Sequence, residues 1–251
     1  MQAIRIYETG GPDVLKVETI DSASPAPGQV RIKQKAIGLN FIDIYMRTGA
    51  YPVDGFPAML GMEAMGIVEE LGEGVSDLHT GDRVAYAMIP GAYAEERVID
   101  ADKLVPVPDG IDDQTAAAIM LKGMTAYYLL FRTYPVKPGE TILVYAAAGG
   151  VGSYLTQWAK HIGATVIGCV GSEEKAELAR GHGCDHTILY RNENIPIRVK
   201  EITGGQGVNV VYDAIGQATF MDSLDSLAPF GMMVSYGNIT GKIEPFSPAI
   251  L

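Results

Sequence analysis

One short stretch of small residues has the composition and spacing of a dinucleotide-binding turn. Residues Tyr145–Gly152 read YAAAGGVG, after an apolar run and before a segment with helical periodicity. Small residues let the backbone turn tightly and approach a pyrophosphate, which then lies at the positive end of the following helix. The pattern is A-x-x-G-x-x-G, a variant of the common G-x-G-x-x-G. Such residues can serve packing alone, but the strand before, the helix after and a second strand about 20 residues on favour dinucleotide binding.

The type of dinucleotide is indicated by the residues after the second strand of this unit. An NAD site usually has an acid there to bind the ribose hydroxyls, whereas this chain has Gly171 and Ser172. Ser172 and Lys175 are suited to a 2′-phosphate, and charge-assisted hydrogen bonds of about 1.5–3 kcal/mol each would favour NADPH by about tenfold or more. In the alternative interpretation Glu173 binds the ribose and Lys175 is a solvated helix residue.

The elements expected to position these residues alternate between strand and helix over residues 121–251. We predict strands over 141–145, 164–170, 186–189, 208–212 and 232–236, and helices over 152–162, 173–180, 195–202 and 220–228. This βαβ rhythm is typical of a doubly wound parallel sheet. Residues 1–120 instead have short strands between turn residues, which indicates a small barrel or sandwich. A helix over 114–134 is expected to join the two domains, 1–120 and 121–251.

Composition excludes several classes of protein. The chain has 251 residues and a net charge of −11, which argues against nucleic acid as a main partner and against an anionic membrane surface. Two cysteines are too few for a disulfide framework or a structural zinc site. No apolar run approaches the ~20 residues of a spanning helix. There is no G-x-S-x-G motif of a serine hydrolase. We therefore expect a folded, cytoplasmic protein.

Several sequence blocks occur together and in order along the whole chain. They read GGP at 10–12, AIGLNFID at 36–43, GMEAMG at 61–66, GDRV at 81–84, LKGMTA at 121–126 and VYD at 211–213. With the turn at 145–152, they resemble the zinc-free quinone oxidoreductases (zeta-crystallin type) of the medium-chain dehydrogenase/reductase superfamily. The resemblance implies an α/β protein with an N-terminal GroES-like β-barrel, a C-terminal Rossmann domain, and NADPH-dependent reduction of a small-molecule quinone.

The resemblance also implies a set of site residues. Those expected to contact NADPH are Asn40, Tyr45, Lys122, Thr125, Tyr128, Gly149, Gly150, Val151, Gly171, Ser172, Lys175, Tyr190, Tyr236, Gly237 and Asn238. Asn40 and Tyr45 are also the expected catalytic residues, as hydrogen-bond donors to a developing oxyanion. Ala214 stands where this branch often has a serine or an asparagine.

The resemblance further implies that no catalytic metal is bound. Related zinc-dependent alcohol dehydrogenases have a cysteine and a histidine where this chain has Asn40 and Met62, and neither replacement is a good zinc ligand. Without a Lewis acid, the substrate should accept a hydride readily, as quinones do. The stretch Tyr45–Tyr51 is either an aromatic-lined mouth for such a substrate or a loop that covers the barrel.

Two other functions fit the same residues: an NADPH-dependent enone reductase, and a non-catalytic NADPH-binding protein. Members of the branch usually continue beyond the point where this sequence ends, with a last strand through which their dimers commonly pair. We therefore expect an incomplete Rossmann domain, a chain truncated at its C-terminus, and a homodimer for the full-length protein.

Overall fold

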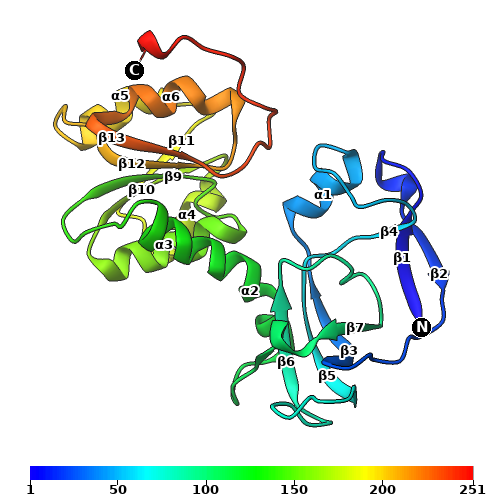
Figure 1. Ribbon diagram of the computed structural model, residues 1–251. Helices are drawn as coiled ribbons and strands as arrows, with labels where there is room; N and C mark the ends of the chain where they lie inside the picture. Colours follow the sequence, from blue (N-terminus) through cyan, green and yellow to red (C-terminus); the bar gives the residue numbers. More distant parts are fainter. Residues whose placement is uncertain (251) are drawn as a thin grey trace. The chain divides into compact units, whose positions relative to one another are not determined.

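The computed structural model describes residues 1–250. The chain divides into two compact units, Met1–Leu121 and Lys122–Leu251. The division falls within helix α2 (Asp113–Tyr128), which continues as a π-helical turn over Leu129–Thr133 (Figure 1). Within residues 1–250 no helix is both long enough and apolar enough to cross a membrane.

The first unit is built from two antiparallel sheets. Their strand orders are β7-β3-β5-β6-β8 and β2-β1-β4. The strands are β1 (Gln2–Ile6), β2 (Lys16–Thr19), β3 (Gln29–Gly38), β4 (Ala58–Met59), β5 (Glu63–Leu71), β6 (Arg83–Ala87), β7 (Glu96–Asp100) and β8 (Val105–Pro106). Alternate residues of these strands, among them Val30, Ile32, Val68 and Val84, form the buried core. The one α-helix wholly within this unit, α1 (Phe41–Thr48), follows β3.

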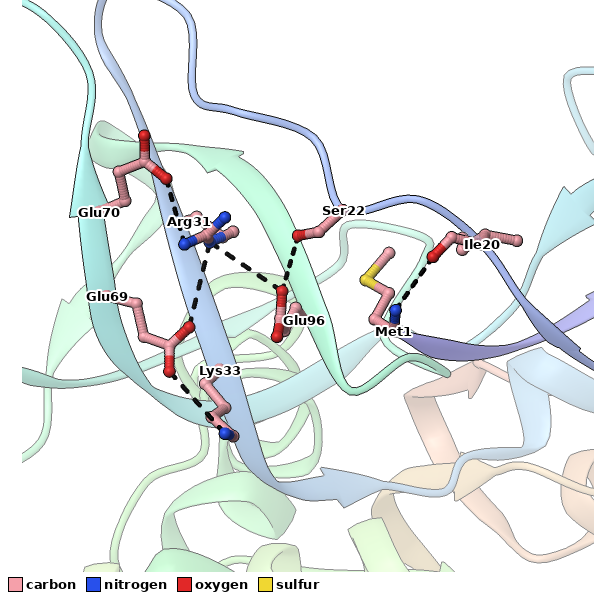
Figure 2. Close-up of polar contacts among 8 residues, drawn as sticks. All are labelled: Met1, Ile20, Ser22, Arg31, Lys33, Glu69, Glu70 and Glu96. Atoms are coloured by element: carbon pink, nitrogen blue, oxygen red, sulfur yellow. Dashed lines mark hydrogen bonds and ion pairs between the residues drawn. The ribbon is translucent and has the colours of Figure 1, made fainter.

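A cluster of charged side chains lies on the larger sheet of this unit (Figure 2). Arg31 on β3 has three carboxylates within 4.0 Å of its guanidinium, those of Glu69, Glu70 and Glu96. The cross-strand register pairs Arg31 with Glu70 of β5, which explains the short 3.1 Å contact. Glu96 also accepts a hydrogen bond from the Ser22 hydroxyl at 2.6 Å. The cluster therefore joins β3, β5 and β7 through partly exposed ion pairs.

The second unit is a five-stranded parallel sheet with helices on both faces (Figure 1). The strand order is β11-β10-β9-β12-β13. The strands are β9 (Thr141–Tyr145), β10 (Thr165–Val170), β11 (His186–Leu189), β12 (Val208–Asp213) and β13 (Leu227–Ser235). The helices are α3 (Gly150–Ile162), α4 (Glu173–Gly181), α5 (Ile195–Ile202) and α6 (Phe220–Asp225). The predicted α/β class, with a doubly wound parallel sheet, is confirmed.

Alternation along the strands explains how both faces are covered. On β9, Ile142 and Val144 pack with the α3 and α4 side chains, whereas Leu143 and Tyr145 pack with the Ile195 and Val199 side chains of α5. Every second residue of the strand is thus apolar toward a different helical layer. A strand buried on both faces reads as a continuous apolar run, which is why this sheet was recognisable from the sequence.

The boundary between the last helix and the last strand differs from the prediction. We expected a helix over 220–228 and a strand over 232–236, but α6 ends at Asp225 and β13 begins at Leu227. Leu227 pairs with Val208, and an irregularity follows in which Phe230 takes a positive φ of 63°. The helical spacing of the apolar residues near Leu227 misled the prediction, because pairing with β12 outweighs local preference there.

Candidate functional site

The turn between β9 and α3 has the backbone geometry of an anion-binding turn. Gly149 is the N-cap residue of α3, and Ala146 takes a left-handed conformation with φ of 52°. A Cβ on Gly152 would overlap the Ala146 carbonyl oxygen, so a glycine is needed where the helix approaches the turn. The first peptide N–H groups of a helix have no partner within it and carry partial positive charge. An anionic group fits at this end of α3.

Helix α2 brings a cation to the same turn. A Cβ built on Gly150 would lie 3.0 Å from the Lys122 Cε, so the lysine side chain extends over this glycine. Thr125 and Tyr128 follow Lys122 at intervals of three residues, which places the three side chains along one side of α2. Val151, the second residue of α3, packs instead against the hydrophobic core.

A second group of predicted residues lies at the carboxyl ends of β10 and β11. The parallel register pairs Val170 with Leu189, so the residues that follow these two strands are neighbours. A Cβ on Gly171 would lie 2.7 Å from the Tyr190 Oη. The Ser172 Oγ caps α4 by accepting the Lys175 N–H at 3.4 Å. The geometry thus brings four predicted residues, Gly171, Ser172, Lys175 and Tyr190, to one edge of the sheet.

Arg191 is a further cation at this edge that our sequence analysis did not identify. Its guanidinium carbon lies 6.0 Å from the centre of the Tyr190 ring, within the range of a weak cation–π contact. A basic residue directly after a short strand was the available signal. From the sequence, only the turn after β10 is considered as the determinant of cofactor type, so Arg191 is not included.

The predicted segment Tyr236–Asn238 directly follows β13. The Tyr236 N–H donates to the Asp213 carbonyl at 2.9 Å, which continues the pairing with β12 beyond the strand. A Cβ on Gly237 would lie 2.6 Å from the Ala214 carbonyl oxygen. Burial raises the pKa of the Tyr236 hydroxyl, and the nearby Asp213 and Tyr128 raise it further. The ring is therefore a neutral hydrogen-bonding group beside α2.

Asp213 organises this part of the sheet edge. Its side chain is fully buried and accepts four hydrogen bonds. The donors are the peptide N–H groups of Ile215 at 2.6 Å and Gly216 at 3.2 Å, and the hydroxyls of Thr219 at 2.7 Å and Ser223 at 2.8 Å. The loop held in this way then pairs with the segment after β13, since the Thr240 N–H donates to the Ile215 carbonyl at 2.8 Å.

In the first unit the two predicted catalytic residues lie on one short helix. Asn40 is the N-cap residue of α1, and its N–H donates to the Asp43 Oδ2 at 2.9 Å. Tyr45 lies one turn further along, with its ring centre 5.8 Å from that of Phe41 and 5.0 Å from that of Tyr51. The stretch that begins at Tyr45 is therefore partly helical, and three aromatic rings form a continuous apolar strip.

Asn40 and Met62 bear on metal binding, because they stand where the related zinc-dependent enzymes have a cysteine and a histidine. Met62 and Asn40 are both buried. Within residues 1–250 no three histidine, cysteine or acidic side chains are grouped so as to hold a metal ion. Asn40 instead donates hydrogen bonds to two carboxylates, from its amide to Glu63 and from its N–H to Asp43.

Comparison with known proteins identifies the family. Residues 26–109 match the family model described as alcohol dehydrogenase GroES-like domain, and residues 150–251 match the one described as zinc-binding dehydrogenase. A quinone oxidoreductase of Pseudomonas aeruginosa is 51% identical over 249 residues, which cover 99% of this chain and 77% of the relative. The chain belongs to the quinone oxidoreductase family of the medium-chain dehydrogenase/reductases.

Other relatives agree with this membership and broaden the range of activities. A structure of Escherichia coli quinone oxidoreductase complexed with NADPH has a TM-score of 0.97 and 46% sequence identity, and the match covers 100% of this chain and 77% of that one. A 2-haloacrylate reductase of a Burkholderia species is 49% identical over 98% of this chain and 75% of the relative. The family resemblance and the GroES-like and Rossmann folds predicted from the sequence are thus confirmed. The chain spans about three quarters of the length of these relatives.

Proposed function

We propose that this oxidoreductase transfers a hydride or electrons from NADPH to a quinone. The observation that carries the proposal is the turn between β9 and α3, where Gly152 permits the close approach of helix and turn and Lys122 extends over Gly150. A Cβ at Gly150 would compete with the lysine for the space beside the helix end. These features fit a dinucleotide pyrophosphate, which needs backbone N–H groups, a cation and no side chain in its path.

The 2′-phosphate of NADPH is assigned to the edge formed by β10 and β11. Ser172 offers a hydroxyl there, Lys175 lies in the first turn of α4, and Arg191 lies over Tyr190. A dianionic phosphate is favoured by two cations and by the N-terminal end of α4, whereas the ribose hydroxyls of NADH gain little from them. Tyr236–Asn238 and the side of α2 with Thr125 and Tyr128 are assigned to the remaining cofactor contacts.

NADPH, when bound, would supply the hydride. The chain's own contribution is to orient the substrate and to stabilise charge on its oxygen, and the expected residues are Asn40 and Tyr45. Tyr45 has a hydroxyl for this purpose, and it also belongs to the aromatic strip with Phe41 and Tyr51. A planar quinone stacks favourably on such rings, which supports a quinone over a small aliphatic substrate.

Calorimetric titration with NADPH and, separately, NADH tests the cofactor assignment. We expect NADPH to bind at least about tenfold more tightly than NADH, because NADH lacks the 2′-phosphate and so loses at least one charge-assisted hydrogen bond. Lys175→Ala and Arg191→Ala should each weaken NADPH binding and leave NADH binding unchanged. Lys200→Ala, on the exposed part of α5, is the matched control. Equal affinities for the two cofactors would transfer the ribose contact to Glu173 and contradict the NADPH assignment.

Turnover with different acceptors tests the substrate assignment. A second candidate function, reduction of an activated carbon–carbon double bond, is favoured by the 49% identity to the 2-haloacrylate reductase. NADPH oxidation should be followed with menadione, a 2-haloacrylate and a simple alkenone at matched concentrations. Faster turnover of menadione supports the quinone assignment, and faster turnover of either alkene supports the second candidate. Tight NADPH binding without any turnover would support a non-catalytic NADPH-binding protein. A cytoplasmic location and a homodimer of the full-length chain stay predictions.

A further inference from the structure

Glu63 is a buried carboxylate whose place in the fold is closely defined. It is the first residue of β5, and its side chain has no exposed surface. The antiparallel register pairs it with Gly38 of β3. A Cβ on Gly38 would overlap the Glu63 side chain, so the carboxyl group extends over the glycine and fills that space. Burying a carboxylate is costly unless hydrogen-bond donors surround it.

Two donors from separate elements approach the two carboxylate oxygens of Glu63. The Asn40 Nδ2 donates to Oε1 at 2.9 Å, and the Leu121 N–H donates to Oε2 at 2.7 Å. A carboxylate can only accept hydrogen bonds, so chemistry determines which end of the Asn40 amide faces it. The NH₂ end must point at Glu63, and the Oδ1 must lie on the other branch of the amide.

The backbone of Asn40 is held independently of its side chain. Its N–H donates to the Asp43 Oδ2 at 2.9 Å, and the same oxygen accepts the Tyr93 hydroxyl at 2.9 Å. The Asn40 residue is 8% exposed, so solvent has little access to it. The start of α1 would therefore keep its position if Glu63 were changed. The Asn40 amide is oriented at its NH₂ end by the Glu63 carboxylate and at its oxygen by the Asp43 N–H of the α1 capping box.

We propose that Glu63 is a positioning residue, which fixes the orientation of the Asn40 amide and anchors α2 at Leu121. The proposal rests on the proposed function, in which Asn40 contacts the substrate or the cofactor. Leu121 immediately precedes Lys122, so the hydrogen bond at its N–H is made next to the proposed phosphate ligand in the chain. One carboxylate thus serves two segments that carry proposed site residues.

Glu63→Gln separates a positioning role from a structural one. A glutamine has a single acceptor, and if its Oε1 accepts the Leu121 N–H, its NH₂ group faces Asn40. The Asn40 amide can then rotate by a half turn and accept with Oδ1, which keeps its hydrogen bond to residue 63, gives up the acceptance of the Asp43 N–H in the capping box of α1 and reverses the amide. The variant should therefore still fold and present the wrong end of Asn40 to a ligand. Glu63→Ala, which removes both acceptors, is the second variant.

The first test reads the amide directly by ¹⁵N–¹H NMR of the side-chain NH₂ groups. The Asn40 signals are assigned by their loss in Asn40→Ala, and the exposed Asn192 serves as reference. We expect one Asn40 NH₂ proton to resonate downfield and to exchange with solvent at least about tenfold more slowly than the NH₂ protons of Asn192. Both features should be lost in Glu63→Gln and in Glu63→Ala. Asn40 signals unchanged in both variants would overturn the proposal. This test needs neither cofactor nor activity.

The second test is a double-mutant cycle in NADPH-dependent turnover of menadione. We expect Glu63→Gln to lower kcat by at least about tenfold in the wild-type chain. In an Asn40→Ala background it should lower kcat by less than about twofold, because its effect passes through Asn40. If the double variant lowers kcat by the product of the two single-variant factors, the proposal is overturned. Tyr86→Phe removes a partly buried hydrogen bond of 2.6 Å to Gln34 on the same sheet and is the matched control, expected to retain wild-type kcat.

The two tests also distinguish this proposal from the proposed function. If the wild-type chain neither binds NADPH nor reduces menadione, the proposed function fails, and the NMR measurement alone decides whether Glu63 orients Asn40. If the wild-type chain is active and the Asn40 signals respond to Glu63→Gln without loss of kcat, the orientation exists but does not serve the reaction, which contradicts the proposal.

Discussion

Replacing Asp213 should reveal how much of the second unit depends on one buried carboxylate. In Asp213→Ala the peptide N–H groups of Ile215 and Gly216 lose their acceptor in a buried loop. Each unsatisfied buried donor costs about 1–3 kcal/mol. The hydroxyls of Thr219 and Ser223 can rotate toward other acceptors, so we assign the cost to the two N–H groups. We therefore expect a loss of about 3 kcal/mol, a large part of the ~5–15 kcal/mol available to a domain.

Asp213→Asn provides the matched comparison. The asparagine keeps one acceptor oxygen for the two N–H groups and turns an NH₂ toward the two hydroxyls, which can rotate to accept. Its cost should be about 1 kcal/mol, as for the loss of one ordinary hydrogen bond. Asp100→Ala removes an exposed acid of the first unit, whose side chain accepts a hydrogen bond from the Gln29 amide, and should cost about 0.5 kcal/mol or less.

The assay is urea unfolding followed by tryptophan fluorescence. The chain has a single tryptophan, Trp158, and it lies on α3 in the second unit. The signal therefore reports that unit even if the two units unfold separately. A loss below about 1 kcal/mol in Asp213→Ala would refute the reasoning, since it would mean that the loop after β12 finds other acceptors. In the surviving folded fraction, NADPH affinity should also fall, because the loop pairs with the segment that follows Tyr236.

Three further predictions follow from other parts of the chain. Gly152→Ala should weaken NADPH binding about tenfold or more in calorimetry, because the added Cβ overlaps the Ala146 carbonyl and displaces the turn. Arg31→Met should cost about 1 kcal/mol in thermal unfolding at low salt and less at 1 M salt, because Glu70 and Glu96 in the cluster of Figure 2 then lose their cationic partner, Glu69 keeps only Lys33, and salt screens the difference. Asp112 directly precedes α2, and its carboxylate accepts hydrogen bonds from the Thr115 N–H and hydroxyl, which lower its pKa. The stability that these hydrogen bonds contribute is fully present above the unfolded pKa of about 3.9. It is lost as the pH falls through the lower folded pKa. Asp112→Ala should accordingly be less stable than wild type at pH 6, with a difference in unfolding midpoint that vanishes in strong acid.

The second unit could be predicted from the sequence because its signals are local. Apolar runs such as Ile142–Tyr145 are bounded by turns, and the helices between them have clear periodicity. The site residues at the strand ends were found for the same reason, since a parallel sheet brings its carboxyl ends to one edge. The glycine turn needed no tertiary information, because the carbonyl that excludes a side chain at Gly152 belongs to Ala146, only six residues earlier.

Features that depend on pairing across the chain could not be predicted in the same way. Helix α1 was not foreseen, because it has only eight residues, and its start is held by the contact between Asn40 and Asp43 and by a hydroxyl from Tyr93. The early start of β13 depends on Val208 of the neighbouring strand. Arg191 acquires its proposed role only from the register of β10 and β11, which brings Tyr190, the residue before it, beside Gly171.

The two buried carboxylates show why sequence patterns identify ligand-binding residues more readily than the residues that position them. Glu63 accepts from Asn40 and from Leu121, the residue before Lys122, whereas Asp213 accepts from the loop that pairs with the segment after Tyr236. Both lie in sequence blocks that carry the family resemblance, GMEAMG and VYD, but a lone acid in a strand is consistent with many roles, so these blocks do not reveal which groups each carboxylate binds. The partial signal is a glycine whose missing side chain makes room: Gly38 beside Glu63, and Gly237 where the segment after β13 meets Ala214, the residue after Asp213. Only Glu63 has a glycine directly across the strand, since Asp213 is paired with Ser235 and Gly237 meets the backbone of Ala214. An acid that faces such a glycine is therefore a candidate for a buried hydrogen-bond acceptor, and the variants of Glu63 test that rule.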